Sequence, residues 1–419
     1  MTALAITEDP NTGTPPTTAQ LLARFAPLLA DIAAGAAARE ASRSLAYDAV
    51  ARLAEAGFTA VRIPHADGGS GATLSQSLRL LRALAQADPN LVQALRAHFT
   101  AVESLLASPD AARRSRWFAR ITAGGILGNA TTEKGNAPGT NSTLLIERGG
   151  HLVLNGTKYY STGSLYADWI QVHADTETGA SVRATVRRDA EGVHVVDDWD
   201  GFGQRLTASG TARFEDVAVD PHDVVDAPRG GTGFTAAYVQ ANLLVALGGI
   251  AGAARDDAVR YVRGRTRTFS HGIGDSAQRD PLVQEVIGRL SSSVAAIDAV
   301  LDALGVRIQE AARRYTVGDL DAPATQELDA AVSEAQVFVV EQTLAVTNQL
   351  FEVGGASAVS EGLGLDRHWR NARVLGQHNP VIYRAREVGQ HRLTGDQHTT
   401  AIYVGTPHQD AEPTTGEPA

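Results

Sequence analysis

The sequence contains no cysteine and only one methionine, and aromatic residues make up 5% of its 419 residues. Without cysteine, the chain has no disulfide, no thiolate nucleophile and no metal site with cysteine ligands. Basic residues number 37 and acidic residues 47, and the net charge of −10 argues against nucleic-acid binding. The sequence also lacks an apolar run of roughly 18 residues and a signal-peptide pattern, so we expect no membrane partner and a cytoplasmic location.

The hydrophobic share of 43% is typical of a folded globular protein, and the length predicts two or three domains. Residues 1–18 are rich in threonine and proline, which predicts a flexible arm. Residues 19–124 place apolar side chains three and four positions apart. This spacing predicts an N-terminal α-helical domain.

The periodicity changes after Gly124. Residues 125–230 form short alternating runs separated by turn residues, which predicts an antiparallel β-domain, a small barrel. Residues 231–400 contain three long helical segments and a fourth, which predicts an up-and-down four-helix bundle. Residues 401–419 are polar and are expected to form a flexible tail. The predicted fold class is α+β in the order α–β–α, and helices that are apolar on more than one face, beginning at Phe234, predict an oligomer.

One cluster of candidate functional residues lies in the β-domain, in the string NGTKYYSTGSLYADW. Lysine, two tyrosines and several hydroxyl side chains occupy the seven positions from Lys158 to Ser164. Hydroxyls and backbone N–H groups beside glycine suit a planar ligand with oxygen and nitrogen edges. An ordinary strand with serine and threonine on its wet face explains the same string, and the pattern alone favours this simpler interpretation.

Two histidines and a group of arginines are further candidates. His98 lies within a helical string, and His378 lies between a helix and a segment that begins with proline. Neither has a second histidine three or four positions away, so no metal site is expected. His98 taken alone is more typical of a satisfied core histidine than of a catalyst. The run RYVRGRTRTF gathers four arginines, which form either a phosphate clamp or a solvated basic helix end.

Four strings together resemble the acyl-CoA dehydrogenase superfamily over roughly residues 20–400. RIPHADGGSGATLSQSLRLLRALAQADPN is similar to the family's glycine turn and the helix after it. NGTKYYSTGSLYADW is similar to its flavin-side motif, with Tyr160 and Thr162 at the positions of a tryptophan and a threonine. DGFGQRLTASGTARFEDVAV and LFEVGGASAVSEGLGLDRHWRNARVL resemble a later β-segment and the Gly-Gly turn with its helix. Each string alone is a weak signal, but four in the family's order are strong.

The string GQHNPVIY departs from the dehydrogenases, which carry a glutamate base in the corresponding segment. This chain has no carboxylate there, so removal of a proton from an acyl thioester lacks its base. The His-Asn-Pro version resembles the two-component flavin-dependent monooxygenases built on this fold. Among these enzymes, the dibenzothiophene and other sulfur-compound monooxygenases resemble the sequence pattern of this chain most. The amine and amino-sugar N-hydroxylases are relatives.

The resemblance implies an oxidoreductase that uses reduced flavin and O₂. A separate NAD(P)H:flavin reductase would supply reduced FMN (FMNH2), with FAD as the alternative cofactor. Reduced flavin would react with O₂ to form a C4a-(hydro)peroxide, and one oxygen would pass to sulfur or nitrogen of a small organic substrate. The protein would supply hydrogen bonds, exclude water from the site and orient the flavin and the substrate. The resemblance also implies a homotetramer, assembled as two dimers through the C-terminal bundle.

The same resemblance assigns catalytic roles. Thr162 would hydrogen-bond near flavin N5, and His378 would donate a proton or stabilise the peroxide. His98 and Asn129 would line the same pocket.

Cofactor contacts are implied in two groups. Tyr160 and Trp199 would supply aromatic walls near the flavin ring, and either Arg265 or Arg267 would hold the phosphate, partly across a subunit interface. The full set of expected cofactor-binding residues is Tyr160, Thr162, Gly163, Trp199, Arg265, Arg267, Phe269, Gly354, Gly355 and Ser357.

Two other functions stay open as alternatives. An FAD-dependent acyl-CoA dehydrogenase or oxidase would retain oxidised FAD tightly and react with acyl-CoA. A non-catalytic protein of the same fold would have lost the flavin chemistry, and the intact strings around Thr162, Gly354 and His378 argue against it.

Overall fold

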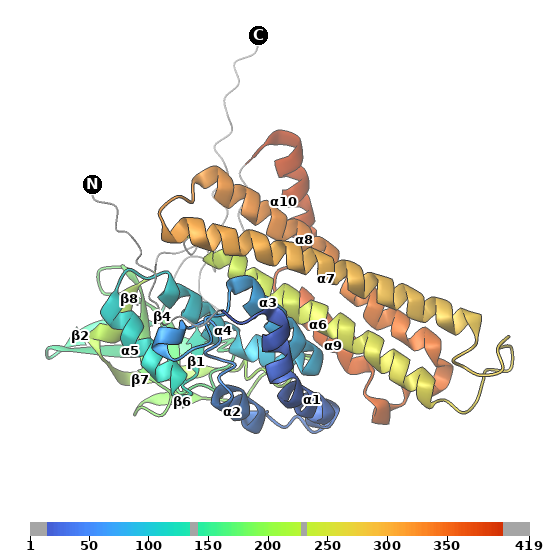
Figure 1. Ribbon diagram of the computed structural model, residues 1–419. Coiled ribbons are helices and arrows are strands. Elements are labelled where there is room, and N and C mark those ends of the chain that lie inside the picture. Colours follow the sequence, from blue (N-terminus) through green and yellow to red (C-terminus); the bar gives the residue numbers. More distant parts are fainter. Residues whose placement is uncertain (1–14, 135–140, 228–232, 397–419) are drawn as a thin grey trace, which may run out of the picture.

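The computed structural model describes residues 15–134, 141–227 and 233–396 (Figure 1). The predicted N-terminal arm and C-terminal tail, and the PRGGTG stretch expected between domains, lie wholly or mostly outside these residues. Within them, a group of helices precedes a β-sheet and a second group of helices follows it. The predicted α–β–α order is confirmed.

Polar caps fix where the helices of the N-terminal part begin. Thr17 and Thr73 each form a capping box, in which the side-chain oxygen accepts from a backbone N–H three residues later. Asp88 ends one helix and caps the next, which starts at Pro89. The helices are α1 (Thr18–Ser42), α2 (Tyr47–Glu55), α3 (Leu74–Ala87), α4 (Pro89–Leu106) and α5 (Ala111–Thr122), with a 3-10 turn at His65–Asp67.

The central part is one mixed sheet. Its strands pair in the order β6-β7-β3-β2-β4-β5-β8, and β1 pairs with β4. Strand β4 runs parallel to both β1 and β2, so the prediction of an all-antiparallel domain was wrong at these pairings. Long connections allow parallel pairing, and hydrophobic alternation does not reveal which strands are neighbours. The strands are β1 (Leu127–Ala130), β2 (Leu144–Arg148), β3 (His151–Lys158), β4 (Trp169–Thr176), β5 (Ser181–Arg187), β6 (Val193–Val195), β7 (Ala212–Val219) and β8 (Val224–Asp226), with a 3-10 turn at Pro221–Asp223.

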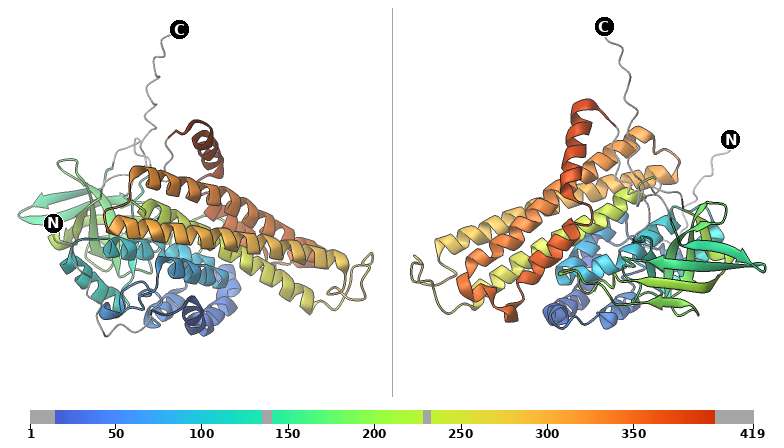
Figure 2. Two further views of the ribbon diagram at one scale, coloured as in Figure 1. Left: turned by 45° about the horizontal axis from the view of Figure 1, so that its top comes forward. Right: turned by 180° about the vertical axis from the view of Figure 1, so that it is seen from behind.

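Alternate residues of these strands face one shared hydrophobic core. Ile170, Val172 and Ala174 of β4 lie in this core with no exposed surface, together with Leu154 of β3. The sheet therefore curls around its own apolar side chains, at the end of the molecule away from the long helices (Figure 2). Among the described residues, β6 and β8 do not pair with each other, so the predicted barrel is not closed by hydrogen bonds.

Long helices form the C-terminal part. Helices α6 to α9 pack as a bundle, and α10 packs against α8 and then projects beyond the bundle (Figure 1). The prediction of one fourth helix was wrong, because the chain turns between α9 and α10, where Pro380 lacks a backbone N–H and disfavours a helical residue before it. The elements are α6 (Thr235–Gly264), α7 (Pro281–Thr316), α8 (Ala322–Gln349), α9 (Asp366–Gly376) and α10 (Val381–Thr394), with 3-10 turns at Leu350–Val353, Gly355–Val359 and Glu361–Leu363.

Helix α6 is the central helix of the molecule. It packs against α3, α4, α7, α8 and α9. Glycine permits the close approach to α3, because a Cβ on Gly249 would lie 2.4 Å from the Cβ of Ala85. The apolar surface of α6 is thus buried inside one chain. The sequence-based argument that this helix needs a second subunit to cover it does not hold.

Helices α1 and α6 are long and apolar enough to cross a membrane, judged by length and composition alone. In α6, 83% of the most apolar stretch is buried inside the protein, as in the core helix of a soluble protein. The corresponding value for α1 is 28%. Its buried residues, Leu21, Phe25, Leu29 and Ile32, recur at helical spacing on one face.

Candidate active site

A connected row of hydroxyl groups joins the segment between β3 and β4 to the segment between β6 and β7. The Oγ1 atom of buried Thr162 lies 2.8 Å from Oγ of Ser209, which lies 2.7 Å from Oγ1 of Thr207. Thr207 donates its proton to the backbone carbonyl of Gln204, at 2.9 Å. Because each hydroxyl has one proton, Ser209 then donates to Thr207, and the proton of Thr162 goes to Ser209 or to the backbone oxygen of Tyr160, 3.3 Å away. The oxygen of Thr162 is left as a hydrogen-bond acceptor.

Gly163 sets this segment directly on α4. Its φ is +81°, and a Cβ there would lie 2.0 Å from the backbone oxygen of Ala94. Both the left-handed backbone and the close contact require glycine. The backbone N–H of Gly163 donates to the carbonyl of Thr207 at 2.9 Å. Gly163 therefore positions Thr162 on α4. The sequence had suggested that backbone N–H groups beside this glycine bind a ligand, but the N–H of Gly163 is already bonded within the protein.

Two buried side chains in this region have polar atoms without a partner among the described residues. They are Ser161, through its Oγ, and Gln204, through both atoms of its amide. Their exposed fractions are 0% and 2%. A buried polar atom without a partner costs about 1–3 kcal/mol, so such atoms mark places where water or a ligand supplies the missing bond. These atoms fit a planar ligand with polar edges, as a flavin ring is.

Aromatic rings lie next to the hydroxyl row. The ring of Tyr160 meets the ring of Trp199 edge to face, with 6.0 Å between centroids, and lies 4.5 Å from the ring of Tyr159. Tyr160 has a positive φ of 56° and is 46% exposed. The structure brings Tyr160 and Trp199 together, as expected for two walls of one site.

A buried ion pair supports the end of β3. The Nζ atom of Lys158, which has no exposed surface, donates to Glu133 at 2.7 Å and to Asn141 at 2.6 Å. Despite partial burial, these hydrogen bonds and those from Thr143 and Ser142 lower the pKa of Glu133 to about 2. Lys158 thus anchors the chain on either side of residues 135–140 and is not a free catalytic amine.

Asn129 lies beside the Thr162 segment. Its backbone oxygen accepts a hydrogen bond from Oγ of Ser164 at 3.1 Å, and its side-chain amide donates to Oγ1 of Thr131 at 3.4 Å. The structure thus brings Asn129 and Thr162 into one neighbourhood through Ser164.

His98 has a different role from the catalytic one implied by the resemblance. Its Nε2 lies 3.0 Å from the backbone oxygen of Thr59, and its Nδ1 accepts from the backbone N–H of Leu127 at 3.3 Å. The side chain has no exposed surface, and burial lowers its pKa to about 4. Both ring nitrogens are therefore used to join α4 to β1 and to the chain before α3. The simpler interpretation of a satisfied core histidine is correct.

His378 lies in the turn between α9 and α10, with an exposed side chain. Its Nε2 lies 3.1 Å from Nη2 of Arg96 on α4. Arginine can only donate, so Nε2 accepts and the other ring nitrogen carries the proton. The surrounding protein atoms and the charge of Arg96 lower the pKa of His378 below the usual value for histidine. At neutral pH the imidazole is uncharged and is a hydrogen-bonding group with one N–H to donate.

The neighbouring residue holds this turn in place. The side-chain amide of Asn379 donates to Oε1 of Gln240 on α6 at 2.5 Å, and its backbone oxygen accepts from Nε2 of Gln336 on α8 at 2.6 Å. His378 is thereby held by α4, α6 and α8. Arg96 was missed in the sequence, although a charged residue in a largely buried helix, two positions before His98, was a usable signal.

The second group of expected cofactor residues, around Arg265, lies far from His378 within one chain. Arg265 follows α6 directly, and the 25 residues from Gln240 to Arg265 span about 38 Å of helix. This length exceeds that of a flavin mononucleotide. The structure therefore does not bring the arginine group and His378 into one site of a single chain.

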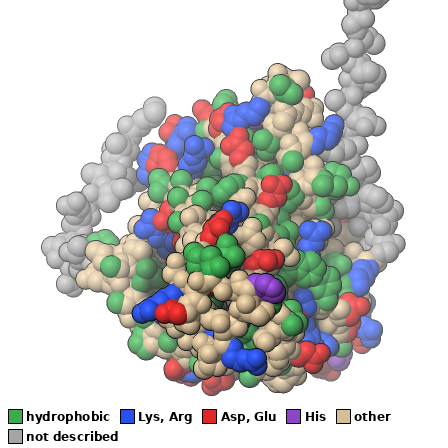
Figure 3. All heavy atoms as spheres, turned by 90° about the vertical axis from the view of Figure 1, so that its right-hand side faces the viewer, with side chains coloured by type: hydrophobic (Ala, Val, Ile, Leu, Met, Phe, Trp, Pro, Cys, Tyr) green, Lys and Arg blue, Asp and Glu red, His purple; other side chains and the backbone are tan. Residues whose placement is uncertain are grey.

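Within the second group, Arg265 donates to the backbone oxygen of Val353 at 2.6 Å. The arginine segment thus lies beside the Gly-Gly turn, where Gly355 has a positive φ of 56°. This end of the bundle shows basic, acidic and apolar side chains interspersed (Figure 3). The side chains of Arg267, Phe269 and Ser357 are exposed, and Gly354 packs against Tyr261.

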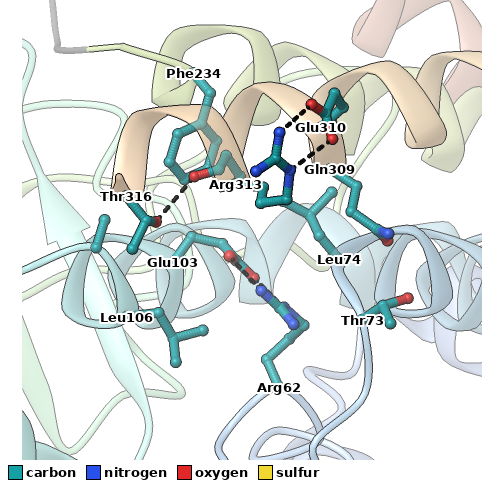
Figure 4. A pocket seen from close by; sticks show the side chains of 12 residues that line it. Arg62, Thr73, Leu74, Glu103, Leu106, Phe234, Gln309, Glu310, Arg313 and Thr316 are labelled. Atoms are coloured by element: carbon teal, nitrogen blue, oxygen red, sulfur yellow. Dashed lines mark hydrogen bonds and ion pairs between the residues drawn. The ribbon is translucent and has the colours of Figure 1, made fainter. Parts of the chain in front are cut away.

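A separate pocket of about 320 Å³ lies between α4, α7 and the start of α3 (Figure 4). Two ion pairs line it, Arg62 with Glu103 at 2.5 Å and Arg313 with Glu310 at 2.6 Å. Each charge is matched, and no expected site residue lines the pocket, so we assign it no role. Within the described residues, no group of three His, Asp or Glu side chains could hold a metal ion.

Three family models match consecutive parts of the chain. They are the N-terminal domain of acyl-CoA dehydrogenase at residues 20–125, its middle domain at residues 129–217 and its C-terminal domain at residues 243–382. The chain therefore has the acyl-CoA dehydrogenase fold in all three of its parts.

Among characterised relatives, dibenzothiophene monooxygenase of Rhodococcus qingshengii is 28% identical over 364 residues, which cover 82% of this chain and 86% of the relative. A probable FMNH2-dependent monooxygenase of Pseudomonas putida is 27% identical over 367 residues, which cover 84% of this chain and 89% of the relative. FMN-bound TdsC from a Paenibacillus species superposes with a TM-score of 0.84 at 27% identity, over 91% of this chain and 99% of that structure. Methanesulfinate monooxygenase of Pseudomonas fluorescens superposes with a TM-score of 0.82 at 26% identity, over 91% of this chain and 99% of that structure.

The protein is thus an acyl-CoA dehydrogenase-fold protein. It is related to the flavin monooxygenases that act on dibenzothiophene and other sulfur compounds.

Proposed function

We propose that the protein is a monooxygenase that uses reduced FMN and O₂ to add one oxygen atom to sulfur or nitrogen of a small organic substrate. The observation that carries this proposal is the pair formed by His378 and Arg96, in the turn where a dehydrogenase of this fold would need a carboxylate base. A neutral imidazole whose Nε2 already accepts from an arginine can donate a hydrogen bond, but its lone pair is not free to take a proton from an acyl thioester.

In the balanced reaction, one oxygen atom of O₂ is added to the substrate, and the other leaves as water with two electrons and two protons from reduced FMN. When bound, the reduced flavin supplies these electrons. His378 offers its N–H as a fixed hydrogen-bond donor on one side of the site. Thr162 and the unpartnered Ser161 and Gln204 offer polar atoms on the other side.

The hydroxyl row supports a preference for reduced flavin. Flavin N5 carries a hydrogen in the reduced form and only a lone pair in the oxidised form. Because the proton of Thr162 is taken by Ser209 or by the backbone oxygen of Tyr160, its oxygen is available to accept from an N–H group and has no proton for a lone pair. We therefore expect the purified protein to carry little flavin and to bind reduced FMN more tightly than oxidised FMN.

The distance between His378 and the group around Arg265 supports a site shared by two subunits. His378 and Thr162 of one copy would hold the flavin ring, and Arg267 of another copy would hold the phosphate. This arrangement accords with the homotetramer implied by the resemblance. Reduced flavin would come from a separate NAD(P)H:flavin reductase, and FAD is the alternative cofactor.

The test is turnover with FMN, NADH and a general flavin reductase over a panel of thioethers, thiophenes and amines. We expect a product heavier than the substrate by one oxygen atom, which comes from ¹⁸O₂ and not from labelled water. Tightly retained FAD that is bleached by an acyl-CoA would instead establish the dehydrogenase alternative.

A further inference from the structure

Arg96 is a half-buried arginine whose charge nothing in the described residues matches. Its single hydrogen bond runs to His378, which is neutral. Burial lowers the pKa of Arg96 to about 10, so the guanidinium is still charged at neutral pH. Three other half-buried arginines do have a carboxylate partner: Arg39 pairs with Asp88, Arg62 with Glu103 and Arg370 with Glu40.

A partly buried charge without a counter-charge is unfavourable unless a ligand provides one. The guanidinium has five N–H donors in a planar fork, which matches an oxyanion with two oxygens. Only one of its nitrogens has a hydrogen-bond partner within the described residues. The other nitrogens are not among the polar atoms that are both buried and without a partner. They are free to bind an anion that comes from solvent.

The position of Arg96 on α4 connects it to the proposed reaction site. Gln93, Arg96, Ala97 and Thr100 share one face of the helix by their spacing. Three of these are only half-buried, and Gln93 is buried with an unpartnered Oε1. This incompletely covered face lies between Ala94, against which Gly163 packs, and His378. An anion bound here would lie beside the imidazole.

We propose that Arg96 binds an anionic group of the substrate, so that the substrate class is an organic carboxylate, sulfinate or sulfonate that carries the sulfur or nitrogen to be oxidised. This inference rests on the proposed function and narrows its substrate. The names of the relatives include both kinds of compound, since dibenzothiophene is neutral and methanesulfinate is an anion. Arg96 assigns this chain to the anionic kind.

The first experiment compares matched substrates. Phenylsulfanylacetate and its methyl ester present the same thioether with and without a negative charge. With FMN, NADH and a flavin reductase, wild-type protein should prefer the acid in kcat/KM by at least about 10-fold. Arg96→Gln should lower kcat/KM for the acid by about 10²-fold and, because it also releases His378, that for the ester by about 10-fold, so that the ratio of acid to ester falls to about 1, while Arg96→Lys keeps part of the preference. Arg307→Gln, which removes an exposed arginine on α7, is the matched control and should behave as wild type.

The second experiment measures binding without turnover. Calorimetry on flavin-free protein tests benzoate, benzenesulfinate and benzenesulfonate against neutral isosteres. At least one anion should bind wild-type protein about 10-fold more tightly than it binds Arg96→Gln. Reduced FMN, measured under argon, should bind both proteins equally. A loss of FMN binding without a loss of anion binding would assign Arg96 to the cofactor and overturn the inference.

The two proposals fail separately. If the ester is used as well as the acid and no anion distinguishes the two proteins, the substrate assignment is wrong, while oxygenation of any neutral thioether leaves the proposed function standing. If anions bind through Arg96 but no panel compound is ever oxygenated, the anion site stands and the monooxygenase does not.

Discussion

Arg265 donates a hydrogen bond to the backbone oxygen of Val353, 2.6 Å away, and this contact fastens the end of α6 to the chain just before the Gly-Gly turn. The sequence left open whether Arg265 or Arg267 holds the cofactor phosphate. Because Arg265 is already committed to a carbonyl, while Arg267 is exposed and has no bonded partner in the described residues, Arg267 is the better phosphate ligand.

Substitution separates these two roles. Arg267→Gln should weaken binding of reduced FMN by about 10-fold or more, since it removes a charge-assisted hydrogen bond, and should leave the melting temperature unchanged. Arg265→Gln should lower the stability by about 1 kcal/mol and affect FMN binding less. Anaerobic titration and thermal unfolding measure both quantities. The opposite pattern, with Arg265 controlling affinity, would reverse the assignment.

The separation of about 38 Å along α6 between Gln240 and Arg265 predicts complementation between subunits. Arg267→Gln and His378→Ala should each make little product on their own. Co-expression should form mixed oligomers in which some sites combine an intact Arg267 with an intact His378, and product formation should return in part. Light scattering should give about four times the 44.0 kDa of one chain. A stable monomer, or no recovery on co-expression, would show that each chain carries a complete site.

Helical and strand periodicity was sufficient to predict the α–β–α order, because it reports which face of each element is buried. It could not predict the parallel pairing of β1 with β4, which depends on contacts between distant strands. The same limit affected α6. Its apolar surface was correctly read as buried, but the sequence did not say that α3, α8 and α9 of the same chain cover it.

In the candidate site, too, some residues could be predicted from the sequence and others could not. Thr162, Tyr160 and His378 could be selected because a local string resembles a family motif. The hydroxyl row could not be predicted, since it joins Thr162 to Thr207 and Ser209, which are distant in the sequence and meet only in the folded protein. His98 and Arg96 lie two positions apart on one helix, and only the structure distinguishes the histidine that is bonded on both sides from the arginine that is not.

Thr207→Val tests the direction of the hydroxyl row. Without Thr207, Ser209 loses its acceptor and can turn its proton toward Thr162, whose own proton then goes to the backbone oxygen of Tyr160 or to a ligand. The preference for reduced over oxidised FMN should fall by about 3- to 10-fold, which corresponds to one neutral hydrogen bond. Thr157→Val, at an exposed position on β3, is the control. An unchanged ratio of the two dissociation constants would exclude this role for the row.

His98 predicts how the stability depends on pH. Its pKa is about 4 in the folded protein and about 6.5 in the unfolded chain, so the unfolded state binds more protons between these values. Stability is therefore greatest above pH 6.5 and falls as the pH drops toward 4, by on the order of 3 kcal/mol from this residue. Glu133, whose pKa lies near 2, stays ionised throughout this window.

Urea unfolding between pH 4.5 and 7.5 measures this slope. His98→Gln should be less stable than wild type at pH 7.5, because it loses the acceptor for the N–H of Leu127, but its stability should fall less on acidification. A residual slope is expected, since burial also lowers the pKa of His368. His271→Gln, at an exposed position, is the control. Parallel slopes for wild type and His98→Gln would contradict the assignment.

The last prediction concerns His378. His378→Ala should leave folding and FMN binding largely intact, because the turn is held by Asn379 through Gln240 and Gln336. It removes the N–H that we expect to face the reacting oxygen, so product formation should fall by roughly 10²-fold while reduced FMN is still oxidised and hydrogen peroxide is released. Because the charge of Arg96 and the surrounding protein lower the pKa of His378, the wild-type ratio of product to peroxide should stay flat between pH 6 and 8. Melting temperature, product and peroxide are measured together. A folded His378→Ala protein with wild-type product and no extra peroxide, or a wild-type ratio that changes tenfold near pH 6.5, would rule out this role for the imidazole.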